Sequence, residues 1–123
     1  MFGAIRKIFS KAALELSEEQ ILQLEKDPWN LDVVRELSRA FRRDQRPLID
    51  YLRKRATADP HNYLVALGRV YVAADKPTLA ILQYRKYLQT PEGAHHPAAR
   101  EELASIYEKL GKPEDAKRAR AGR

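Results

Sequence analysis

Apolar residues recur along the chain at helical spacing, in segments that short polar or proline-containing breaks separate. Apolar positions three and four residues apart predict amphipathic helices, and no stretch shows the sustained alternation of a half-buried strand. The spacing predicts an N-terminal amphipathic helix over residues 2–16, a short helix after Ser17, and six further helices. We expect these six over residues 31–43, 47–58, 63–74, 77–88, 98–110 and 113–120. The chain is therefore predicted to be all-α.

Several residues mark where these helices begin and end. Ser17 and Gln20 have the spacing of a capping box, in which each side chain satisfies a free backbone donor of the helix start. Pro77 suits the first turn of a helix, and Gly111 suits the position just after a helix ends. Residues 90–96 contain proline and glycine and are predicted to form a loop.

The helical segments repeat with a period of some thirty residues. The motif DPWN at residues 27–30 opens one round, DPHN at residues 59–62 opens the next, and a third round closes near Ala116. Such self-similarity is typical of stacked helix pairs, in which each unit buries a face against its neighbour. We therefore expect about three helix pairs, the first incomplete, in one domain over residues 17–123, preceded by the N-terminal helix over residues 1–16.

The second and third units resemble the tetratricopeptide repeat family. The matching positions are Leu64, Leu67, Gly68, Tyr71, Ala80 and Tyr84, and then Leu103, Ala104, Tyr107, Gly111 and Ala116. The first unit fits less well, through Val34, Leu37, Ser38 and Phe41. The resemblance implies a right-handed superhelical solenoid of antiparallel helix pairs, in which small residues such as Gly68 let two helices approach closely. The alternative is a helical bundle without repeats.

The same resemblance implies that the first helix of each unit lines a concave groove. The partner-binding residues expected there are Arg35, Arg39, Arg42, Arg43, Asn62, Val65 and Arg69. The third unit would add Ala98, Glu101, Ser105 and Glu108. The first four arginines recur at three- and four-residue spacing and are predicted to share a helix face, and guanidinium groups bind carboxylate or phosphate through two hydrogen bonds. The alternative is a solvated surface, paired with Glu36 and Asp44.

Charge favours an anionic partner. The chain has 23 basic and 17 acidic residues, a net charge of +6, and the basic residues concentrate in residues 35–55. A basic block attracts an acidic peptide, nucleic acid or anionic lipid. We expect a non-catalytic adaptor or scaffold that binds an acidic protein or peptide segment. The alternative is a basic repeat protein that binds nucleic acid or an anionic membrane surface.

The residue types argue against an enzyme. His61, His95 and His96 are expected in exposed turns, without the third ligand of a metal site or the partners of a catalytic set. No glycine-rich phosphate loop occurs, so neither a cofactor nor a metal is expected. There are no cysteines and no apolar run of the about 20 residues that span a bilayer, so a cytoplasmic protein is expected. Trp29, just before a helix start, is expected to act as a hydrophobic staple.

The N-terminal helix carries large apolar residues on one side and basic residues on the other. The apolar side consists of Phe2, Ile5, Ile8 and Phe9. A helix this short needs its apolar face buried. It is expected to cover the open end of the repeat array. The alternatives are a homodimer through this helix and peripheral binding to an anionic membrane.

Overall fold

The computed structural model describes the backbone of residues 11–122 and the side chains of residues 18–122. Seven α-helices and one short 3-10 helix make up this part, which contains no strand, so the all-α prediction is confirmed for it. The helices are α2 (Lys11–Lys26), α3 (Leu31–Ala40), α4 (Arg46–Ala58), α5 (Pro60–Ala73), α6 (Pro77–Leu88), α7 (Pro97–Lys109) and α8 (Pro113–Arg120). The 3-10 helix η1 (Gly93–His95) lies in the loop predicted over residues 90–96. Phe2, Ile5, Ile8 and Phe9 lie outside the described residues.

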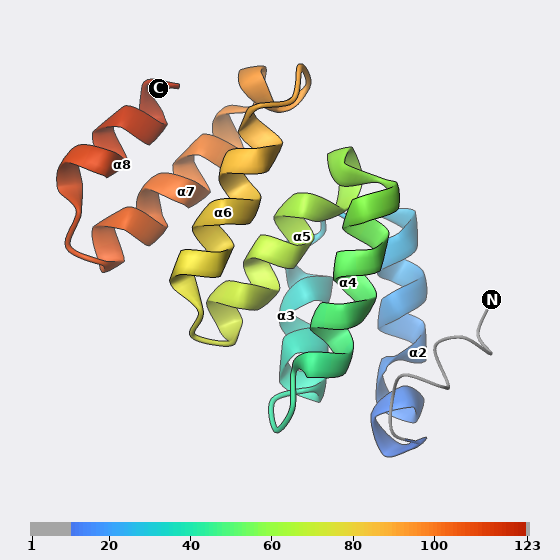
Figure 1. Ribbon diagram of the computed structural model, residues 1–123. Coiled ribbons are helices and arrows are strands. Elements are labelled where there is room, and N and C mark those ends of the chain that lie inside the picture. Colours follow the sequence, from blue (N-terminus) through green and yellow to red (C-terminus); the bar gives the residue numbers. More distant parts are fainter. Residues whose placement is uncertain (1–10, 123) are drawn as a thin grey trace.

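The helices follow one another across the molecule, with α2 at one end and α8 at the other (Figure 1). Close packing joins α2 to α3, and α4 to α5, α5 to α6, α6 to α7 and α7 to α8 in sequence; it also joins α3 to α5. The predicted pairs α5/α6 and α7/α8 are present. The first expected pair differs, because α3 packs against α2 and α5 rather than closely against α4.

Gly68 lies at a close approach of α5 to α6. A Cβ atom on Gly68 would lie 2.8 Å from Cε2 of Tyr84, and the Tyr84 side chain is itself almost fully buried. A side chain at this position would therefore displace a packed ring. The close helix approach that the sequence predicted at Gly68 is confirmed.

The turns α5–α6 and α7–α8 have the same backbone structure. In each, a lysine N–H donates to a tyrosine carbonyl five residues earlier at 2.9 Å, from Lys76 to Tyr71 and from Lys112 to Tyr107. The residue before each lysine has positive φ, 59° at Asp75 and 72° at Gly111. Residues 36 positions apart in the sequence therefore form turns with the same hydrogen bond and the same positive φ.

The similar motifs DPWN and DPHN start their helices at different residues. Asn30 caps α3, because its Oδ1 accepts hydrogen bonds from the backbone N–H groups of Asp32 and Val33. In the second motif Asp59 is the cap, and its Oδ1 accepts from the N–H of Asn62 at 3.3 Å. Helix α5 therefore begins at Pro60, three residues before the predicted start.

Two further predicted boundaries were wrong. Helix α2 runs from Lys11 through Ser17 to Lys26, so Ser17 does not cap a new helix and the helix crosses the expected boundary at residue 16. Strong helix formers on both sides of Ser17 outweigh its preference for a cap. Helix α3 ends at Ala40, and residues 41–43 form a turn instead of continuing the helix.

The described helices bury one continuous apolar core. Its largest fully buried side chains include Tyr63, Tyr84, Tyr87, Leu24, Leu48 and Leu52. Within residues 11–122, no helix combines the length and the apolar character needed to cross a membrane.

Candidate functional site

A groove with a volume of about 330 Å³ opens across α3, α5 and α7. These are the helices that the sequence predicted as the first of each unit. Residues that line it include Arg35, Val72, Ala73, Ser105, Ile106 and Lys109. We call it the α3/α5/α7 groove. Val72 is exposed, so the lining includes accessible apolar surface as well as polar side chains.

A hydrogen-bonded network closes the floor of this groove. The Arg69 guanidinium binds both Glu102 carboxylate oxygens, with Nε–Oε1 and Nη2–Oε2 distances of 2.8 Å. Its Nη1 donates to the Trp29 carbonyl at 2.8 Å, and the Tyr84 hydroxyl donates to Glu102 Oε1 at 2.8 Å. The network joins the α2–α3 turn to α5, α6 and α7, so it fixes how the walls of the groove sit relative to one another.

The electrostatics of the network favour the ionised pair. Burial would raise the pKa of the Glu102 carboxyl, but the hydrogen bond and positive charge of Arg69 outweigh burial and hold that pKa below its ordinary value. Burial and the neighbouring Glu102 carboxylate raise the pKa of the Tyr84 hydroxyl, which therefore stays a hydrogen-bond donor. The Glu102 charge is thus neutralised from within the protein.

Trp29 and His96 form an aromatic contact next to this network. Their rings stack at 4.5 Å between centroids, and Tyr87 meets Trp29 edge-on at 5.2 Å. The Nδ1 atom of His96 also accepts the Ala99 N–H at 3.2 Å and caps α7. His96 is therefore a structural residue and not the exposed turn residue that was expected. Trp29 packs on Tyr87 and His96, and its role as a hydrophobic staple stays a prediction.

Two cations at the groove remain available to a ligand. Arg35 is exposed, and its only ion pair among the described residues is a loose 3.9 Å contact with the exposed Asp32. Lys109 is exposed and forms no ion pair within residues 18–122. An exposed pair such as Arg35–Asp32 holds its partners weakly in water. The groove therefore combines apolar lining residues with two accessible cations.

The structure brings together fewer of the predicted residues than expected. Arg35 and Arg69 both line the groove, but Arg69 is already bound to Glu102 and its side chain is only 10% exposed. Arg39 is exposed on α3 away from the groove lining. Arg42 and Arg43 lie in the turn after α3, because that helix ends at Ala40, and they do not share its face.

Two further predicted positions offer no groove surface. Val65 is 1% exposed and belongs to the core, because α5 packs against α3, α4 and α6. Asn62 is half-buried in the first turn of α5, where its Nδ2 donates to Asp59 Oδ2 at 2.9 Å. The resemblance implied that both residues contact a partner, but in the structure both make contacts within the fold.

The third unit also differs from expectation. Ser105 lines the groove, but Glu101 and Glu108 both bind Arg120 of α8, at 2.9 and 2.6 Å. Sequence reasoning missed Glu102 and Lys109 as groove residues. Glu102 is adjacent to the expected Glu101 but points about 100° away from it around the helix, so the sequence held no clear signal for it.

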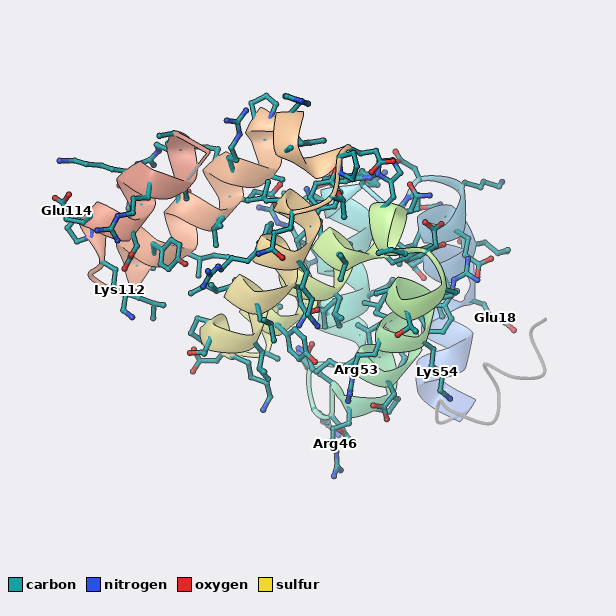
Figure 2. The ribbon with its side chains drawn as sticks, turned by 45° about the horizontal axis from the view of Figure 1, so that its top comes forward. Glu18, Arg46, Arg53, Lys54, Lys112 and Glu114 are labelled. Atoms are coloured by element: carbon teal, nitrogen blue, oxygen red, sulfur yellow. The ribbon has the colours of Figure 1, made fainter. Side chains whose placement is uncertain are left out.

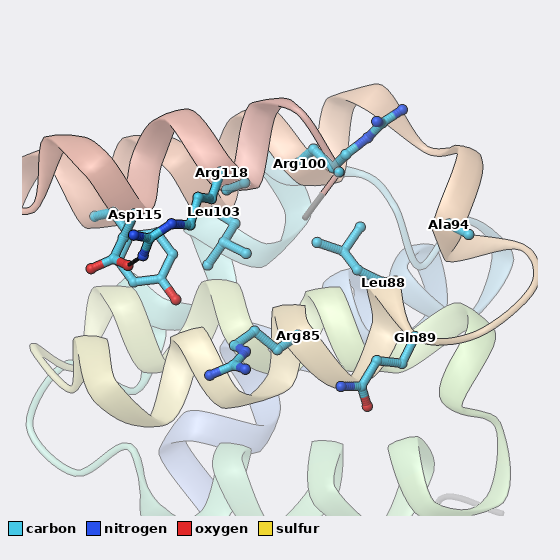
Figure 3. Close-up of a pocket in the computed structure, with 11 residues that line it drawn as sticks. Arg85, Leu88, Gln89, Ala94, Arg100, Leu103, Asp115 and Arg118 are labelled. Atoms are coloured by element: carbon cyan, nitrogen blue, oxygen red, sulfur yellow. Dashed lines mark hydrogen bonds and ion pairs between the residues drawn. The ribbon is translucent and has the colours of Figure 1, made fainter.

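A second hollow, of about 440 Å³, lies between α6, α7 and α8. Figure 3 shows its three arginines, Arg85, Arg100 and Arg118, extending in different directions rather than toward a common point. Arg118 is bound to Asp115 at 3.0 Å. This hollow therefore lacks the convergent donors of an anion site. Elsewhere in the described part, no group of three or more potential metal ligands occurs.

No family model matches the chain, and no curated protein sequence is significantly similar to it. The resemblance to the tetratricopeptide repeat family therefore stays a prediction from the residues quoted above.

Proposed function

We propose that this chain is a non-catalytic adaptor whose α3/α5/α7 groove binds an apolar protein segment flanked by acidic residues. One observation carries the proposal: the groove is lined both by the exposed apolar side chain of Val72 and by two accessible cations, Arg35 and Lys109. Apolar contact would supply affinity and the cations would orient the carboxylates of the ligand.

The internal network supports this proposal. Glu102 lines the groove, and a free carboxylate there would repel an acidic ligand. Arg69 and Tyr84 satisfy that carboxylate, so the accessible charges of the groove, Arg35 and Lys109, are positive. A floor held by four short hydrogen bonds is also preorganised, which lowers the entropy lost on binding.

We further propose that α5–α8 are two units of a superhelical solenoid of the tetratricopeptide repeat type. The repeated turns at Asp75 and Gly111 and the close approach at Gly68 support it. The first unit would then be atypical, as terminal units of such arrays are.

A random peptide library displayed on phage tests the binding proposal. We expect the wild-type protein to select peptides with Asp or Glu on both sides of apolar residues. Arg35→Glu/Lys109→Glu should weaken binding of a selected peptide by about tenfold or more, which is about 1.4 kcal/mol. Arg42→Glu/Arg43→Glu is the matched control, because it makes the same charge change outside the groove and should have a much smaller effect.

The rival function is binding of nucleic acid or anionic lipid by bulk positive charge. It is favoured by Arg39, Arg42 and Arg43, which are exposed and form no ion pair within residues 18–122. Salt weakens both kinds of binding, so competition has to separate them. If random-sequence RNA or phosphatidylserine vesicles displace the peptide and both double reversals weaken binding equally, the groove proposal is wrong.

A further inference from the structure

A larger groove, of about 670 Å³, lies on another side of the molecule between α4 and α6. Leu64, Leu67 and Tyr71 of α5 line it between these two helices. Leu79 and Leu82 of α6 also line it and are 42% and 46% exposed. They are three residues apart and therefore share a face of the helix. We call this surface the α4/α6 groove.

This surface is separate from the α3/α5/α7 groove. Arg69 and Val72 of α5 line the first groove, whereas Leu64, Leu67 and Tyr71 line the second. Helical periodicity places these two sets on opposite faces of α5. A ligand in one groove therefore leaves the other accessible.

The charges around the α4/α6 groove have one sign. Arg53 of α4 and Lys86 of α6 line it, and no lining residue is a carboxylate. Figure 2 shows Arg53 and Lys54 extending outward from α4. Asp50 lies with Arg53 and Lys54 around a separate, shallow hollow beside the groove. In the described part neither Arg53 nor Lys86 forms an ion pair.

We propose that the α4/α6 groove is a second docking surface, which receives an acidic amphipathic helix of another protein. A groove between two helices with exposed leucines fits the apolar face of a third helix. Carboxylates beside that face would meet Arg53 and Lys86. A second copy of this chain fits less well, because each copy carries a net charge of +6.

Two grooves on opposite faces of α5 allow the chain to hold two acidic segments at once. The inference about the α4/α6 groove does not depend on ligand binding at the α3/α5/α7 groove. Each groove has its own exposed residues, so each can be tested with substitutions that leave the other unchanged.

The probe is a synthetic peptide of about 18 residues, long enough for partial helicity in water, with leucines on one face and glutamates elsewhere. Its counterpart has lysine in place of each glutamate. We expect the acidic peptide to bind and the basic one not to bind, by fluorescence anisotropy. Leu79→Ser/Leu82→Ser should weaken binding by about tenfold or more. Leu22→Ser is the matched control, because Leu22 on α2 is 42% exposed and lies outside both grooves.

Arg53→Glu/Lys86→Glu provides a second arm that changes no apolar residue. This double substitution should also weaken binding of the acidic peptide. Arg35→Glu/Lys109→Glu should change the affinity for that peptide by no more than about twofold. Circular dichroism verifies that each variant is folded. Equal binding of the acidic and basic peptides would overturn the proposal, as would equal losses in Leu22→Ser and Leu79→Ser/Leu82→Ser. A wild-type dimer that Leu79→Ser/Leu82→Ser converts to a monomer would also overturn it, because the occupant would be a second copy.

Discussion

The Arg69 guanidinium on α5 donates two hydrogen bonds of 2.8 Å to the Glu102 carboxylate on α7, although the two residues are 33 positions apart in the chain. The third contact of the guanidinium, to the Trp29 carbonyl, extends the link to the turn before α3. One side chain therefore ties all three predicted units together beneath the α3/α5/α7 groove.

Breaking this pair should destabilise the protein. Arg69→Met leaves the Glu102 charge without its partner, and Glu102→Met leaves the buried guanidinium unpaired. We expect each to lower the free energy of unfolding by about 2–3 kcal/mol, less than for a fully buried pair because the Glu102 side chain is 28% exposed. Urea denaturation measures the loss.

The double variant Arg69→Met/Glu102→Met separates pairing from simple truncation. The double variant should lose clearly less free energy of unfolding than the two single variants lose together, because no unpaired charge remains buried. Arg120→Met is the surface control, since its pair with Glu101 is exposed, and it should cost far less. Strictly additive single losses would contradict the coupling.

Low pH should lower the free energy of unfolding, in part because Glu102 becomes protonated. The pKa of this carboxyl is lower in the folded protein than in the unfolded chain, whose value is near 4.5. Its contribution is therefore complete above about pH 4.5 and is lost as pH falls through the folded value. Urea denaturation at pH 7 and at lower pH should show a steeper loss of stability in the wild type than in Glu102→Gln. Parallel pH profiles would mean that Glu102 titrates normally.

Substitution of Gly68 should overpack the α5–α6 crossing. Gly68→Leu should cost roughly 1–3 kcal/mol or more, and thermal denaturation measures it. Gly68→Ala should cost less but remain destabilising, because its Cβ would press on Tyr84, which Glu102 holds in place. Wild-type stability in Gly68→Leu would contradict the close approach of the two helices.

Substitutions at the two equivalent turn positions, Asp75 and Gly111, should have opposite effects on stability. Asp75→Gly should stabilise the protein by roughly 0.5 kcal/mol, because φ is 59° there and glycine adopts positive φ without strain. Gly111→Ala should destabilise by about 1 kcal/mol, since φ is 72°. Ala74→Gly is the matched control. Its φ is −85°, so glycine brings no relief and should lower stability in the same urea titration.

Deletion of residues 1–10 tests the role predicted for the N-terminal apolar face while leaving α2 (Lys11–Lys26) intact. If Phe2, Ile5, Ile8 and Phe9 cover the end of the array, the shortened chain should lose stability with no change in oligomeric mass. Light scattering, thermal denaturation and vesicle flotation distinguish the alternatives. A dimer that becomes a monomer would indicate self-association, and loss of vesicle binding alone would indicate a membrane anchor.

The sequence by itself predicted the all-α class and most helix boundaries. The starts of α6 and α8 were predicted correctly, because Pro77 and Pro113 suit the first turn of a helix. The close approach of two helices at Gly68 and the glycine that follows the end of α7, Gly111, were also predicted, from local packing and backbone preferences. Ser17 was misread, because a cap signal competes with the helix preference of its neighbours and the sequence does not show which one wins.

The tertiary structure decided which charged residues are free to bind. Arg35 and Arg69 looked alike in the sequence, yet Arg35 stays exposed at the groove and Arg69 is neutralised by Glu102. Val65 looked like a surface position and lies in the core. Spacing along a helix specifies a face, but the rotation of each helix and its contacts with distant residues determine whether that face meets solvent, a partner charge or the protein interior.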